Sequence, residues 1–184
     1  MHEPEGVIAP AQLRITQIVA GTLIAGVWIF LAVVLFLVHV QNQGQGIAPA
    51  RDFPYLSLIA AFMLVTLVPM SILLPRFMSQ SSMGQLAAGT WKPPEGMDRA
   101  ALSTVTAKLL AIYQTTLIVR LAMLEGAAFM ALVAYLLEAQ PWVLGLVAAA
   151  LALMALGFPT RGRAQAWLDS QADTLAVLRE GKQG

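Results

Sequence analysis

The sequence has no cysteine, only two histidines, and charged residues at 11% of its 184 positions. Without cysteine there are no disulfides, no thiolate nucleophiles and no cysteine-ligated zinc or iron–sulfur sites. His2 and His39 stand alone, no glycine-rich phosphate loop occurs, and no serine has an activating partner at a recognisable spacing. We therefore expect no metal, no cofactor and no catalytic residue. The net charge of +1 predicts no affinity for nucleic acid.

Four long apolar runs account for most of the hydrophobic residues, which make up 58% of the chain. They cover about residues 18–40, 55–74, 117–137 and 142–158. A helix needs roughly 20 apolar residues to cross a hydrocarbon core of about 30 Å. The first three runs meet that length, and the fourth needs a small tilt or local thinning of the bilayer. The pattern predicts an all-α, polytopic membrane protein in which residues 1–184 form a single transmembrane bundle.

The connections predict two antiparallel helical hairpins. A four-residue connection at 138–141 joins the third and fourth runs, whereas the central segment 75–107 is long and polar. Within that segment we expect a loop over 79–95, then a helix that is capped by Asp98 and continues into the third run. The tail 159–184 carries an apolar stripe at helical spacing, which predicts a C-terminal amphipathic helix.

Positive charges fall almost entirely on one side of the predicted spans. Short loops rich in Lys and Arg stay in the cytoplasm of bacterial cells, so both termini and the central segment are expected there, with the protein in the inner membrane. The only basic residue in the other connections is Arg51, and Arg120 lies inside the third run. The nine remaining basic residues are Arg14, Arg76, Lys92, Arg99, Lys108, Arg161, Arg163, Arg179 and Lys182.

Arg120 and Glu125 lie inside the third run and, together with Gln114 just before it, form a predicted polar site in the membrane region. A charge at the bilayer centre costs at least about 2.5–3.5 kcal/mol, so it needs a partner, water or neutralisation. Five residues separate Arg120 from Glu125, which places them about 7.5 Å apart along a helix but not on the same face. Three interpretations remain open: a structural tie across the bundle, a proton- or ion-binding carboxylate, and a site that recognises a lipid or a partner helix.

Small residues four positions apart predict places where helix backbones pack closely. Such pairs put two small side chains on one helix face and let a second helix approach. The three pairs are Gly21 with Ala25, Ala122 with Gly126, and Gly145 with Ala149.

The stretch from Ile118 to Ala128 resembles a pattern in small bacterial membrane proteins of unassigned function. In those proteins an I-I-R-x-A-L-L-E-G helix is followed by another span and a P-T-[KR] ending, which is Pro159-Thr160-Arg161 in this chain. The resemblance covers roughly residues 114–163 and implies a four-helix inner-membrane protein with no known activity. A looser similarity to the proteolipid subunits of rotary ATPases rests on hairpins, small residues and one midmembrane Glu. Those subunits carry the carboxylate on the closing helix of a hairpin, whereas Glu125 lies on the opening one, so ring formation is not implied.

Taken together, the sequence predicts an integral inner-membrane protein of structural, accessory or assembly-partner type. Its expected partners are the lipid bilayer and either further copies of itself or another membrane protein. The alternative is a component of a proton- or ion-coupled transporter or channel that uses Glu125.

Overall fold

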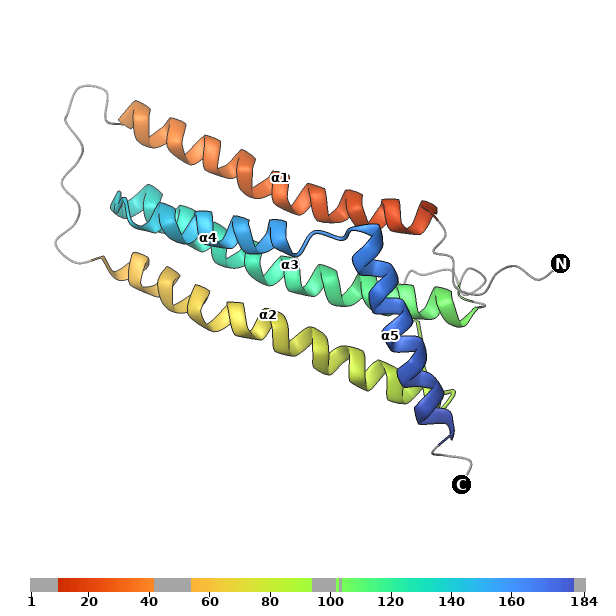
Figure 1. The fold of residues 1–184 in the computed structure, drawn as a ribbon. Helices are drawn as coiled ribbons and strands as arrows, with labels where there is room; N and C mark the ends of the chain where they lie inside the picture. Colours follow the sequence, from red (N-terminus) through yellow and green to blue (C-terminus); the bar gives the residue numbers. More distant parts are fainter. Residues whose placement is uncertain (1–9, 42–53, 94–101, 103, 181–184) are drawn as a thin grey trace.

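The computed structural model describes residues 10–41, 54–93, 102 and 104–180, and every regular element within these ranges is a helix. Four helices run alongside one another, and the fifth crosses one end of them (Figure 1). The predicted all-helical class is confirmed for this part of the chain. The helices are α1 (Pro10–Gln41), α2 (Tyr55–Ala87), α3 (Val105–Glu138), α4 (Val143–Leu156) and α5 (Arg161–Glu180).

Three of these helices, α1, α2 and α3, are long and apolar enough to cross a membrane. The fourth predicted span corresponds to α4, which has 14 residues. At 1.5 Å per residue, α4 is about 21 Å long and falls short of the roughly 30 Å hydrocarbon core. Helices α4 and α5 together are long and apolar enough to cross a membrane, but they are bent by 65° relative to each other. The structure therefore supports a membrane protein with three candidate spans, or four if the bent pair is one span.

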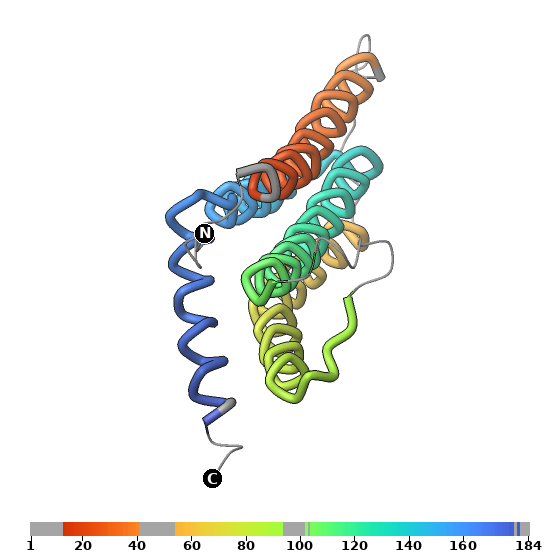
Figure 2. The backbone as a smooth tube through the Cα atoms, turned by 90° about the vertical axis from the view of Figure 1, so that its right-hand side faces the viewer, coloured from red at the N-terminus to blue at the C-terminus, as the bar shows by residue number. Residues whose placement is uncertain are grey.

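Helix α3 is the central element of the fold. It packs against α1, α2, α4 and α5, and Figure 2 shows α1 and α2 on opposite sides of it. The main core lies where α3 meets α1, α2 and α4. Fully buried side chains in this core include Val27, Leu121, Leu132, Val147 and Met154. Because each of the other helices packs on α3, its position determines where they lie.

Helix α1 contacts its neighbours along one narrow seam. Leu13, Ala20, Val27 and Val34 are all buried and follow one another at intervals of seven residues. A seven-residue apolar repeat keeps one side of a helix against a partner at a shallow crossing angle. The rest of α1 is largely exposed, as Ile29 illustrates, which suits a helix surrounded by lipid.

Helix α2 extends further than the sequence predicted. The predicted loop over 79–95 is wrong in its first half, because the helix continues through Pro69 and Pro75 to Ala87. A proline inside a helix removes one backbone hydrogen bond, so this extension requires packing to offset the loss. Met83 and Leu86 provide that packing, since they lie buried in a second core cluster with residues of α3 and α5.

Helix α3 starts later than predicted. Asp98, the expected N-cap, lies outside the described residues, and the helix begins at Val105 with Thr104 as its cap. The Thr104 hydroxyl oxygen accepts a hydrogen bond from the Ala107 backbone N–H at 3.2 Å, which satisfies one of the free donors of the first turn. From Val105 the helix runs without a break through the third apolar run, as expected.

Glu138 was expected in the connection between the third and fourth runs, but it is the last residue of α3 and only 4% exposed. Its carboxylate accepts hydrogen bonds from the backbone N–H groups of Leu56 and Ser57, at 2.7 and 2.9 Å. It also accepts one from the Ser57 hydroxyl at 2.6 Å. The residue before α2, Pro54, provides no side-chain cap. Glu138 therefore caps α2 from another helix, where its negative charge also complements the helix dipole.

The connection between α4 and α5 turns the chain across the end of the bundle. Gln17 of α1 donates a hydrogen bond to the backbone carbonyl of buried Pro159 at 3.0 Å. Arg163 donates to the Leu156 carbonyl at the end of α4, where a positive charge is favoured. The predicted amphipathic helix is present as α5 and buries Ala164, Leu168 and Leu175.

Apart from Arg120 in the middle of α3, the basic residues of the described chain lie toward one end of the molecule. Figure 1 shows the start of α1, the end of α2, the start of α3, the end of α4 and all of α5 at the same end. This end, called the basic end below, carries Arg14, Arg76, Lys92, Lys108, Arg161 and Arg163. Glu138 and the turn between α3 and α4 lie at the other end.

We expect Glu138→Ala to destabilise the fold by about 1–3 kcal/mol, because it leaves buried donors of α2 without an acceptor. Glu138→Gln retains one acceptor oxygen and should cost less. The measurement is the thermal unfolding midpoint in mild detergent. Glu180→Ala is the matched control, since Glu180 is exposed at the end of α5. Equal midpoints for Glu138→Ala and Glu180→Ala would contradict the capping role.

Candidate functional site

Glu125 lies on α3 where that helix faces α1. Its Oε1 atom is 3.4 Å from the point that a Cβ atom on Gly26 would occupy. A larger residue at position 26 would therefore press on the carboxyl group, and glycine allows the two helices to approach there. Glu125 makes no hydrogen bond or ion pair with any described residue. The structure thus places a half-buried carboxyl group between two of the candidate spans, with no partner among the residues that the structure describes.

Arg120 points to a different part of the molecule. Its Cζ atom is 3.6 Å from the point that a Cβ atom on Gly157 would occupy, beside the end of α4. Its Nε atom is buried and has no hydrogen-bond partner in the described chain. Arg120 and Glu125 form no ion pair, in agreement with the five-residue spacing that turns them to different faces of the helix.

Gln114 does not join either charged residue. It is half-buried on α3, and it is eleven positions from Glu125, about 16 Å along the helix axis. It also lies outside the set of residues that line the cavity described next. The three residues of the predicted polar site therefore occupy separate environments and do not form one site.

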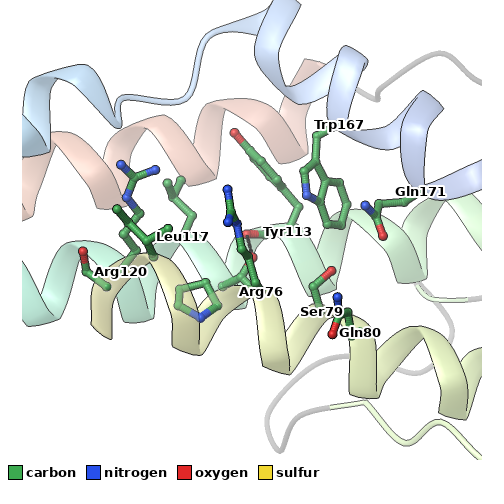
Figure 3. Close-up of a pocket in the computed structure, with 12 residues that line it drawn as sticks. Arg76, Ser79, Gln80, Tyr113, Leu117, Arg120, Trp167 and Gln171 are labelled. Carbon is green, nitrogen blue, oxygen red and sulfur yellow. Dashed lines mark hydrogen bonds between the residues drawn. The ribbon is translucent and has the colours of Figure 1, made fainter. Parts of the chain in front are cut away.

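A cavity of about 650 Å³ lies between α2, α3 and α5 near the basic end. Figure 3 shows its lining, with Arg76 on α2, Arg120 and Tyr113 on α3, and Trp167 on α5. Of the predicted site residues, only Arg120 belongs to it. The complete lining consists of Ser71, Ile72, Pro75, Arg76, Ser79, Gln80, Tyr113, Thr116, Leu117, Arg120, Trp167 and Gln171.

The cavity is positively charged. Two arginines line it, and no Asp or Glu does. The aromatic rings of Tyr113 and Trp167 lie 5.2 Å apart between centroids, at 50° to each other, and close the α5 side. A cationic, partly aromatic cavity of this kind can hold an anionic group by charge-assisted hydrogen bonds.

The sequence did not predict that Arg76 and Trp167 line one cavity together with Arg120. The three residues come from three helices, and only the extension of α2 and the turn into α5 bring them together. One signal was present: the Pro75-Arg76 step directly follows an apolar run, a position where basic side chains meet lipid head groups.

The three predicted packing pairs do not pack within the chain. Added Cβ atoms at Gly21, Gly126 and Gly145 would meet nothing within 4 Å. Their partners Ala25, Ala122 and Ala149 are all exposed. Within one chain the pairs face away from the helices on which their own helices pack, so close packing at these pairs stays a prediction.

Among the described residues, no group of three His, Asp or Glu side chains is placed to hold a metal ion. The chain matches no family model, and neither a curated protein nor a solved structure is similar to it. The resemblance to small bacterial inner-membrane proteins stays a prediction.

Proposed function

We propose that this chain is an accessory or structural protein of the bacterial inner membrane that acts by assembly and not by catalysis. In this proposal it crosses the membrane four times, with α4 as a short, tilted fourth span, and both termini lie in the cytoplasm. The gathering of basic residues at one end supports that orientation, since Lys and Arg near spans are retained on the cytoplasmic side.

The observation that carries the assembly role is an uncovered side of the central helix. Helices α1, α2 and α4 occupy three sides of α3, and the exposed residues Ala122 and Gly126 mark the fourth. We call this side the open face of α3. Tight helix contacts in membranes are built from small residues, because these let two backbones come close. Small residues on the exposed side of a central helix therefore favour the packing of a further helix against that side.

A second copy of this chain is the occupant that the open face fits best. A symmetric pair needs a surface that is complementary to itself, and a small-residue pair meets this need because each backbone packs into the space left by the other. The open face carries no charged residue, so bringing two copies together there would not create repulsion. The proposed assembly is a dimer that meets along α3.

Single-cysteine cross-linking tests this dimer directly, because the native chain has no cysteine. The variant Ala122→Cys, purified and reconstituted in liposomes, should form a disulfide-linked dimer on mild oxidation. Val65→Cys is the control, since Val65 is exposed on α2. A dimer band from position 122 and none from position 65 is expected on a non-reducing gel. If neither position forms a dimer, or if both do equally, lipid covers the open face and the proposal is wrong.

A second candidate function is proton or ion coupling through Glu125. The observation in its favour is the half-buried carboxyl group beside Gly26, which makes no hydrogen bond or ion pair with a described residue. Acidic residues in this position within membrane segments commonly bind protons or ions. The group lies between α1 and α3, so a change in its charge would act on the contact between two helices.

Glu125→Gln separates the two functions, because glutamine retains the shape and hydrogen bonding of the side chain but cannot bind a proton. If Glu125 couples protons, wild-type protein in liposomes should acidify the interior under a membrane potential, and Glu125→Gln should not. The measurement is the signal of an enclosed pH dye, with Glu180→Gln as the control. Identical proton flux in wild type and Glu125→Gln would exclude this second function.

A further inference from the structure

The cavity between α2, α3 and α5 lies at a level of the fold that bears on what it can bind. On α2 it extends from Ser71 to Gln80, where the apolar run gives way to polar sequence. On α3 it extends from Tyr113 to Arg120, where the third apolar run begins. If the chain spans the bilayer, this level of the molecule coincides with lipid head groups.

Both arginines of the cavity are available to a ligand. Arg76 is exposed, and Figure 3 shows its side chain extending from α2 along the cavity. Arg120 also lines the cavity, and its buried Nε atom has no hydrogen-bond partner among the described residues. A buried guanidinium N–H without an acceptor costs free energy. An anion held in the cavity would interact with the guanidinium groups of both arginines that line it.

Further hydrogen-bond donors surround the two arginines. The side chains of Ser79, Gln80, Tyr113 and Gln171 line the cavity and make no hydrogen bond with another described residue. The nearest acids of α5, Asp169 and Asp173, are exposed and do not line it. The site therefore combines two fixed positive charges with several free donors, which is the arrangement that recognises a phosphate.

The lining also has an apolar side that a free phosphate ion would not need. Ile72, Pro75 and Leu117 line the cavity alongside the arginines. A phospholipid presents both chemistries, with a charged phosphate next to a glycerol and acyl chains. Basic cavities between membrane helices on the cytoplasmic side are a known form of site for anionic head groups. We propose that this cavity binds the phosphate of an anionic phospholipid between Arg76 and Arg120.

The test compares lipid binding by two double variants with equal loss of charge. Arg76→Gln/Arg120→Gln removes both cavity arginines, and Arg14→Gln/Arg161→Gln removes two exposed arginines that do not line the cavity. Each full-length protein is taken from vesicles of phosphatidylcholine and phosphatidylglycerol, and bound phosphatidylglycerol is titrated by native mass spectrometry. We expect the cavity variant, which loses two charge-assisted contacts, to bind about a hundredfold more weakly than wild type. The control should bind like wild type.

Equal weakening in both double variants would overturn the proposal, because it would mean that the arginines attract lipid only as general surface charge. A second arm adds inorganic phosphate to protein in phosphatidylcholine alone. If phosphate binds as tightly as phosphatidylglycerol, the lipid identification is wrong and the site takes a soluble anion. The single variant Arg76→Gln controls for misfolding of the double variant. Arg76 is exposed, so its replacement should leave the fold intact and still weaken lipid binding. None of these outcomes depends on whether the chain forms a dimer.

Discussion

The packing of every other helix on α3 is the constraint on which the rest of the structure depends. In a membrane, apolar burial does little to hold helices together, because lipid tails are as apolar as the helix faces. Close packing and a few polar interactions must therefore hold the helices together, and α3 supplies both. It provides the largest share of the main core, it carries Glu138 to the N-terminus of α2, and its first turns hold the second core cluster with α5.

Three charged residues along α3 are accommodated in three different ways. Glu138, at one end, is almost completely buried, and its charge is offset by three hydrogen bonds from α2. Glu125 sits opposite a glycine of α1 and has no partner in the described chain. Arg120 opens into a cavity near the basic end, beside a second arginine. The hydrogen bonds of Glu138 have a structural role, because they cap α2. Glu125 and Arg120 have no such bonds to described residues, so they can interact with a ligand, a proton or an ion.

The sequence was sufficient to predict the helical class and the amphipathic tail helix, because apolar runs and helical spacing are local signals. It was not sufficient for contacts between distant segments. The extension of α2 to Ala87 depends on Met83 and Leu86 meeting α3 and α5, and Ser and Gly residues gave the contrary local signal. Glu138 looked like a loop residue, since nothing local reveals that α2, preceded by Pro54, lacks a cap of its own. The cavity could not be predicted from the sequence for the same reason, because its walls come from three helices.

The central claim is that α3 crosses the bilayer with the arginine cavity on the cytoplasmic side. Side-specific labelling of single cysteines tests it most directly, since the native chain contributes no thiol. Ser81, near the cavity end of α2, and Pro141, in the turn after α3, are both exposed and can each be replaced by cysteine. In intact cells with a permeabilised outer membrane, a membrane-impermeant maleimide should label position 141 and should reach position 81 only after the inner membrane is opened. Labelling of position 81 from outside, or of both positions alike, would contradict the account.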